Sequence, residues 1–181
     1  MAAEKGDFFL DIISKLFGRY ALPNVTRIED ITGRFNGILE NMVFIGCNEM
    51  HNEANSKKLN GDSLKSLITE YDIIYERKNI NTRKGKFYGN LMFFSNHAVT
   101  MDFKDMKRRI LVIEANYKVA QNIKYFGELS KVINDPDFLP NLFTFFKNND
   151  ISKFDPRDIP ITEATTSRME ATTTPWMQFF E

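Results

Sequence analysis

Asn41-Met42-Val43-Phe44-Ile45-Gly46-Cys47-Asn48-Glu49 is a short, almost continuous apolar run that ends in an amide and a carboxylate. A run of this length without alternation is typical of a β-strand that is buried on both faces of a parallel sheet. Ligands of such sheets bind at the carboxyl ends of the strands, so Asn48 and Glu49 are expected at a functional edge. The alternative is an ordinary core strand followed by a solvated glutamate.

Length and composition indicate a single globular domain. The chain has 181 residues, of which 43% are hydrophobic and 27% charged, enough for one sizeable core and too few for two full domains. Because basic and acidic residues balance at 24 each, any contact with nucleic acid has to come from a local basic patch. The one cysteine suits an intracellular compartment, and no apolar run approaches the ~20 residues that cross a bilayer.

The rest of the chain predicts a mixture of helices and strands around this run. A helical stripe covers Phe8–Phe17 and ends at Gly18. The other expected elements are a strand at 24–28, a helical turn at 34–39, a helix from 62 or 63 to 69, strands at 71–75, 90–95 and 110–113, helices within 118–133 and 138–146, an extended segment at 149–162, a threonine-rich linker at 165–174, and a helix that begins near Pro175.

The segment Glu76–Lys86 is strongly basic. Five of its eleven residues carry a positive charge, namely Arg77, Lys78, Arg83, Lys84 and Lys86. This composition predicts a projecting β-hairpin or loop rather than part of the core. Such a segment either binds an anionic partner or is simply a solvated loop.

Polar residues also lie beside two other apolar strands. Asn96 follows the strand at 90–95, and Arg108-Arg109 precedes the strand at 110–113. In nucleotide hydrolysis a carboxylate such as Glu49 polarises the attacking water, an amide orients it, and a guanidinium from an adjacent subunit stabilises the transition state. Taken alone, the two arginines are as well explained as surface charges.

The ordered set of motifs resembles the C-terminal ATPase domain of phage and large-DNA-virus primase–helicases. These are superfamily 3 helicases of the AAA+ class and are related to the poxvirus primase–helicase. The matching segments span residues 7–165 and are Arg34-Phe35-Asn36, Leu39-Glu40, Val43–Glu49 as the Walker B strand, Leu64–Glu70, Glu76-Arg77-Lys78, Phe94-Ser95-Asn96-His97 as sensor 1, Lys107-Arg108-Arg109, Tyr125-Phe126, Asn149-Asp150-Ile151, Phe154–Arg157 and Ile159–Glu163.

The resemblance implies an α/β, P-loop NTPase-like core over residues 1–165 followed by C-terminal helices, with 166–181 as a linker and the start of a further helical segment. It implies Glu49 as the catalytic carboxylate, Asn96 as the sensor, and Arg108 or Arg109 as an arginine finger acting in trans. The basic hairpin would hold single-stranded DNA at a replication fork. The resemblance further implies ATP and Mg²⁺ as cofactors and a hexameric ring as the assembly of the full protein. It also implies a location in the host cytoplasm, a viral factory or the nucleoid.

The sequence departs from the family at two places. Asn48 stands where the family often has Asp, which keeps a metal-binding oxygen and loses a charge. Lys5-Gly6 falls at the position of the Walker A lysine, and no glycine-rich loop or preceding strand comes before it. In the AAA+ sheet this strand lies centrally, between the sensor 1 strand and the strand after the arginines.

Two functional hypotheses follow from the incomplete Walker A motif. The chain is part of an ATP-dependent DNA helicase of viral, phage or mobile-element replication, and it needs a P-loop segment from a longer chain or from a partner. Alternatively, it is a degenerate, non-catalytic module for oligomerisation or DNA binding. A fragment, one half of a split gene and a decayed copy are equally compatible with the sequence.

Overall fold

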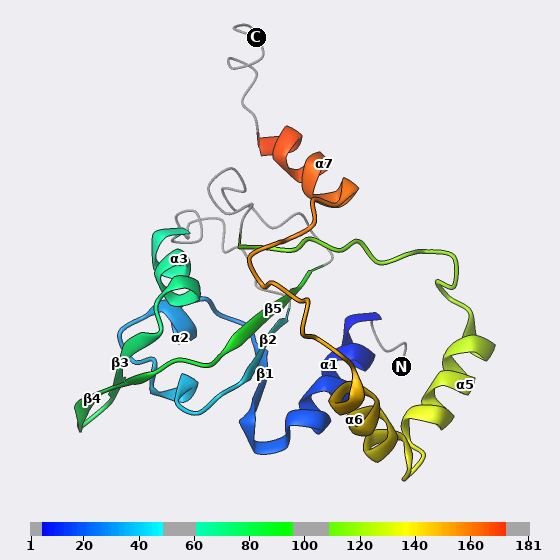
Figure 1. The fold of residues 1–181 in the computed structure, drawn as a ribbon, viewed down its shortest axis with the longest axis horizontal. Coiled ribbons are helices and arrows are strands. Elements are labelled where there is room, and N and C mark those ends of the chain that lie inside the picture. Colours follow the sequence, from blue (N-terminus) through cyan, green and yellow to red (C-terminus); the bar gives the residue numbers. More distant parts are fainter. Residues whose placement is uncertain (1–4, 49–60, 96–108, 173–181) are drawn as a thin grey trace, which may run out of the picture. The chain divides into compact units, whose positions relative to one another are not determined.

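A computed structural model describes residues 5–48, 61–95 and 109–172 (Figure 1). The chain divides into two compact units, Met1–Met101 and Asp102–Glu181, and each is described by itself. The first unit contains a parallel sheet and a β-hairpin, and the second contains helices.

The first unit is built on a parallel sheet in the order β1-β2-β5. The strands are β1 (Ala21–Val25), β2 (Phe44–Asn48) and β5 (Asn90–Phe94), and β2 pairs in parallel with both of the others (Figure 1). The first four residues of β2 are all buried, which confirms the expected central strand. The strand expected at 24–28 lies earlier, because Pro23 is tolerated in an edge strand rather than breaking it.

Helix α1 (Lys5–Phe17) packs against the sheet through its apolar stripe. Its buried Leu10 lies over Gly46 of β2, where an added Cβ would be 2.2 Å from Leu10 Cδ1, so a larger residue at this position would require Leu10 to move. Phe17 stacks on Phe44 with ring centroids 6.2 Å apart. The helix ends as expected at Gly18, whose φ of +54° suits glycine.

Two short helices complete the core beside the sheet. They are α2 (Glu29–Thr32) and α3 (Gly61–Thr69), and α3 confirms the helix expected there. Their buried side chains join those of β2 in one cluster that includes Ile31, Ile45, Cys47 and Leu67. Burial raises the pKa of the Cys47 thiol to about 12, so at neutral pH it is a core residue rather than a nucleophile.

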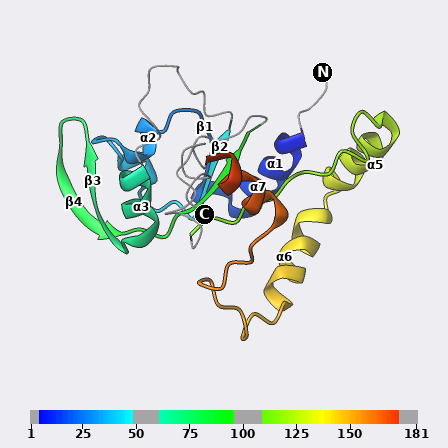
Figure 2. The same ribbon diagram turned by 90° about the horizontal axis from the view of Figure 1, so that it is seen from above.

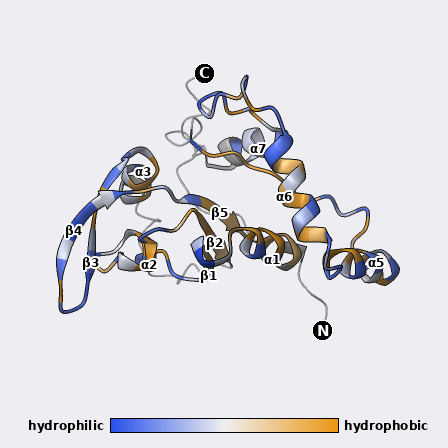
Figure 3. Ribbon diagram, turned by 60° about the horizontal axis from the view of Figure 1, so that its bottom comes forward, coloured by the Kyte–Doolittle hydropathy of each residue, from blue (hydrophilic) through white to orange (hydrophobic). Residues whose placement is uncertain are grey.

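The basic segment forms the predicted hairpin. Strands β3 (Asp72–Arg77) and β4 (Ile80–Lys86) pair in an antiparallel manner, and Asn79 in the turn has a φ of 62°. Figure 3 shows hydrophilic colour along β4, in contrast to the apolar residues of α1. One side of β3 nevertheless reaches the core, since Ile73 and Tyr75 are buried.

The second unit contains α5 (Ile123–Ile133), α6 (Phe138–Asn148) and α7 (Glu163–Thr172), which Figure 2 shows from above. The strand predicted at 110–113 is wrong: these residues form no regular element, and Ile113 is 77% exposed. They have no strand partner among the described residues, and an apolar run alone does not make a strand. Helix α5 begins only at Ile123, after the N-cap Asn122, whose side chain accepts from Tyr125 N at 3.0 Å.

The expected linker at 165–174 is helical as far as Thr172. Thr162 caps α7, because its Oγ1 accepts from Thr165 N at 3.1 Å and donates to Val112 O at 2.7 Å. This cap outweighs the modest helix propensity of the threonines. The helix expected near Pro175 lies outside the described residues, and the boundary expected at 165 stays a prediction.

Candidate nucleic-acid interface and strand-end site

Asn48 lies at the carboxyl end of the central strand. It is half-buried and pairs in register with Phe94 of β5. The sensor strand and the Walker B strand of the sequence analysis are therefore neighbours whose carboxyl ends share one edge of the sheet. An amide oxygen here, followed in sequence by the Glu49 carboxylate, is the kind of oxygen donor that Mg²⁺ takes together with nucleotide phosphates.

The other predicted catalytic residues are only partly covered by the structure. Glu49, Asn96 and Arg108 lie outside the described residues. Arg109 is described as a partly buried residue of the second unit. Lys5 is the first described residue of α1, and its side chain is not described. The roles implied for these five positions, and for Asn48, stay predictions.

The loop that precedes β2 binds the part of β3 that lies near the hairpin turn. The Asn36 side chain acts like a neighbouring strand, since Nδ2 donates to Ile74 O at 3.0 Å and Oδ1 accepts from Glu76 N at 3.0 Å. Arg34 adds an ion pair with Glu76, with Nε and Oε1 2.6 Å apart. These contacts join residues about 40 positions apart in sequence and hold β3 beside the start of β2.

Glu40 is the centre of a second set of contacts. Its side chain is only 15% exposed, and its two carboxylate oxygens bind different arginines of the hairpin. Arg77 Nη2 lies 3.1 Å from Oε2, and Arg83 Nη2 binds Oε1. Arg77 Nη2 also donates to Gly37 O at 3.2 Å.

Gly37 makes this arrangement possible. A Cβ at this position would lie 2.3 Å from Arg77 Cγ and 3.0 Å from Glu76 O, so any side chain would displace Arg77. In the sequence, Asn36 and Glu40 stand out only as matches to a family. Their partners lie about 40 residues further along the chain, and only the fold brings the two segments together.

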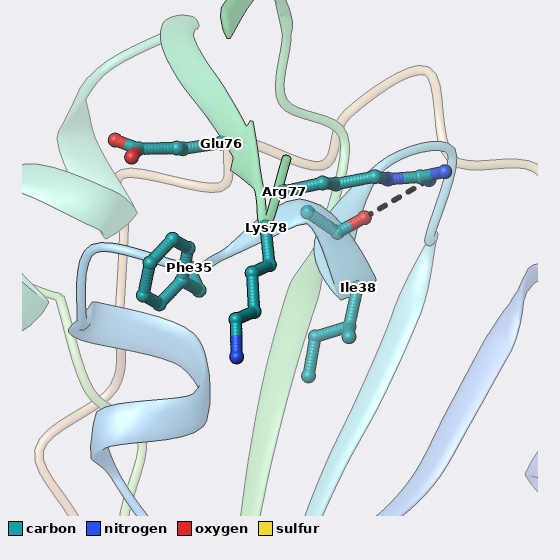
Figure 4. Close-up of a pocket in the computed structure, with 6 residues that line it drawn as sticks. Phe35, Ile38, Glu76, Arg77 and Lys78 are labelled. Atoms are coloured by element: carbon teal, nitrogen blue, oxygen red, sulfur yellow. Dashed lines mark hydrogen bonds between the residues drawn. The ribbon is translucent and has the colours of Figure 1, made fainter. Parts of the chain in front are cut away.

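A pocket of about 290 Å³ opens beside the turn of the hairpin, lined by Phe35, Gly37, Ile38, Glu76, Arg77 and Lys78 (Figure 4). In Figure 4 the Lys78 side chain extends between Phe35 and Ile38. Both apolar side chains are well exposed, at 53% and 45%. The pocket therefore combines an accessible aromatic ring with a cation.

The hairpin lysines differ from its arginines. Lys78 and Lys86 are exposed and form no ion pair with any of the described residues. Lys84 Nζ lies 3.8 Å from Asp72 Oδ2. Both side chains are exposed, so water weakens the attraction between them. The structure thus confirms the hairpin and brings Arg77 and Arg83 together at Glu40, with the lysines elsewhere along the hairpin. Contact of these residues with DNA stays a prediction.

Two further classes of site were searched in the described part of the chain. No three His, Cys, Asp or Glu side chains there gather closely enough to hold a metal ion. Of the helices in ranges 5–48, 61–95 and 109–172, none has the length and apolar character required to cross a membrane.

The architecture defined by this sheet is an α/β fold that occurs in solved structures. The C-terminal region of NrS-1 matches in one structure with a TM-score of 0.77 and 23% identity, over 97% of this chain and 41% of that one. A second structure of the same region gives a TM-score of 0.75 and 21% identity, over 92% and 39%. At these identities the likeness concerns the fold.

The chain belongs to a family described as "Family of unknown function (DUF5906)", whose model matches residues 3–109. It is also related to the DNA Primase-polymerase of Nitratiruptor phage NrS-1, with 30% identity over 108 residues. The match covers 59% of this chain and 15% of the length of that relative. The described hairpin and all three strands of the sheet fall within the family region.

Proposed function

We propose that this chain is part of an ATP-dependent DNA helicase that acts in phage, viral or mobile-element DNA replication inside the host cell. The observation that carries the proposal is the link between two sites. The strand that ends in Asn48, the residue before Glu49 in sequence, is central in a parallel sheet, and the loop leading into it holds the basic hairpin. Relationship to a phage DNA primase-polymerase supports a replication role.

In this proposal ATP and Mg²⁺ lie at the carboxyl edge of the sheet. Asn48 contributes an oxygen to the water shell of the metal, Glu49 polarises the attacking water, and Asn96 orients it. Arg108 or Arg109 acts across the interface of a hexameric ring, and Lys5 approaches the phosphates. The hairpin binds single-stranded DNA at the fork through its basic residues.

A phosphate-binding loop has to come from a segment that supplies a further strand, and β5 offers the edge for it. The edge strand β1 contains Pro23, which has no N–H, and Asn24 with a φ of 61°, and both hinder pairing with another strand. The strand β5 contains neither a proline nor a residue with positive φ. Within the described residues its side away from β2 has no partner.

ATP hydrolysis tests the proposal. We expect the 181-residue chain alone to show little or no ATP turnover, with or without DNA. The reason is that its sequence contains no glycine-rich loop whose backbone N–H groups would bind the phosphates of ATP. A version extended by an apolar strand and a glycine-rich loop ending in Lys and Ser or Thr is expected to hydrolyse ATP. In that version Glu49→Gln should reduce kcat by at least about 100-fold, since water activation is lost.

The outcomes separate the two functional hypotheses. Robust turnover by the 181-residue chain alone, abolished by Glu49→Gln, would show that no further segment is needed. An extended protein that binds DNA and ATP but never hydrolyses it would favour the non-catalytic module. Glu70→Gln, an exposed carboxylate outside the proposed site, serves as the matched control.

A further inference from the structure

The five basic residues of the hairpin form two sets with different surroundings. Arg77 and Arg83 share the carboxylate of Glu40, one guanidinium on each oxygen. The lysines have other surroundings: Lys78 lies between Phe35 and Ile38 (Figure 4), and Lys86 is exposed. The same hairpin therefore carries paired and available positive charges.

Glu40 holds its two arginines more firmly than a surface carboxylate would. At 15% exposure its charge is only partly screened by water, so its attraction to nearby cations is stronger than on an open surface. Charge-assisted hydrogen bonds to guanidinium are also among the strong ones in proteins. Arg77 has a second acceptor as well, because its Nη2 donates to Gly37 O at 3.2 Å.

A phosphate that approaches Arg77 or Arg83 meets a guanidinium whose partner is already present. It has either to displace Glu40, which leaves a half-buried carboxylate without its cations, or to use the guanidinium N–H groups that Glu40 leaves free, beside a negative charge that already balances them. No such exchange is required at Lys78 or Lys86. Lys84 needs only to leave an exposed pair with Asp72, in which the charges are 3.8 Å apart.

We propose that Glu40 is a charge clamp, which withholds Arg77 and Arg83 from nucleic acid and confines phosphate contacts of the hairpin to Lys78, Lys84 and Lys86. The choice of nucleic acid as the anionic ligand rests on the proposed function. The clamp itself rests on the two ion pairs and the burial of Glu40. It makes Glu40 a residue that limits affinity while holding the hairpin in place.

The salt dependence of binding to a labelled oligothymidylate tests this assignment. Each phosphate contact with a single strand contributes about 0.7 to the slope of log K against log salt. Lys78→Ala and Lys86→Ala should each reduce the slope by about 0.7, whereas Arg77→Gln and Arg83→Gln should leave it unchanged. Glu40→Gln should increase it by about 0.7 to 1.4, because one or both arginines become available.

The controls separate the clamp from net charge and from misfolding. Glu70→Gln changes the net charge equally at an exposed position and should leave the slope as it is. Circular dichroism establishes that each variant is folded. If Glu40→Gln does not fold, the arginine and lysine variants still decide, because the clamp requires that only the lysines affect the slope.

Each outcome bears on the clamp, and the clamp and the proposed function can fail separately. If the arginine variants weaken binding as much as the lysine variants, or if folded Glu40→Gln binds like the unmodified chain, the clamp is overturned and DNA binding stands. If only Glu40→Gln binds the oligonucleotide, the clamp is supported and DNA binding by the unmodified chain fails. If neither binds, both are overturned.

Discussion

At the scale of the residue, Glu40 and Gly37 explain how a basic hairpin is held in one position. Glu40 supplies the charge that binds Arg77 and Arg83, and Gly37 supplies the space in which the Arg77 side chain lies. Asn36 adds hydrogen bonds to the backbone of β3. These contacts add to the Arg34–Glu76 ion pair and to the burial of Ile73 and Tyr75 in holding the hairpin.

Gly37→Ala should loosen the hairpin. The new Cβ would meet Arg77 Cγ at 2.3 Å, so Arg77 has to leave Gly37 O and Glu40. We expect a loss of about 1–3 kcal/mol in the free energy of unfolding, typical of overpacking, measured by urea denaturation. Faster amide hydrogen exchange in β3 and β4 would locate the effect.

Gly127→Ala is the matched control for this substitution. Gly127 lies in α5 with nothing within 4 Å of an added Cβ. Alanine there should stabilise the helix by up to about 1 kcal/mol, because it has the higher helix propensity. An equal change in the free energy of unfolding in the two variants would contradict the steric role of Gly37.

At the scale of the element, caps decide where helices begin in the second unit. Helix α5 starts after Asn122 and α7 after Thr162, each through a side-chain oxygen that accepts a backbone N–H. The apolar stripe within 118–133 indicates a helix but not its first residue. In the threonine-rich segment, by contrast, the lack of an apolar stripe concealed a helix that its cap helps to form.

Thr162→Ala should destabilise α7. The change removes the cap on Thr165 N and the hydrogen bond to Val112 O, so a loss of about 1 kcal/mol in helix stability is expected. Faster hydrogen exchange at the first amides of α7 measures it. Ser167→Ala, at an exposed position inside the helix, is the control and should leave these amides protected; similar exchange in both variants would refute the cap.

At the scale of the whole molecule, the proposed ATPase needs parts from more than one segment or subunit. The proposed catalytic carboxylate, Glu49, follows β2 in sequence, whereas the arginines belong to the second unit and are proposed to act on a neighbouring subunit. The outer edge of β5 is proposed to receive the strand that carries the phosphate-binding loop. Assembly is therefore the step on which hydrolysis depends.

Mixing two inactive variants tests action in trans. In the extended protein, Glu49→Gln and the double variant Arg108→Ala with Arg109→Ala should each be inactive alone. A mixed ring contains interfaces with an intact carboxylate on one side and an intact arginine on the other, so turnover should return to about a quarter of the unmodified level. Absence of any recovery in mixed rings, verified by native mass spectrometry, would argue for action within one subunit.

The sequence by itself determined the elements whose signal is local. The central strand follows from a continuous apolar run and α1 from apolar periodicity, and the dense run of basic residues predicts a projecting hairpin or loop. The functional expectation for Asn48 and Glu49 also came from sequence, through the position of polar residues at the end of a buried strand.

Only the tertiary structure decided which residues act together. It excluded the strand at 110–113, because an apolar run forms a strand only where a partner accepts its hydrogen bonds. It also joined Glu40 to Arg77 and Arg83 across about 40 residues, and so divided one basic segment into paired arginines and available lysines. The sequence shows which side chains are charged. Whether a charged side chain is available to a ligand depends on the neighbours that it has in the folded protein.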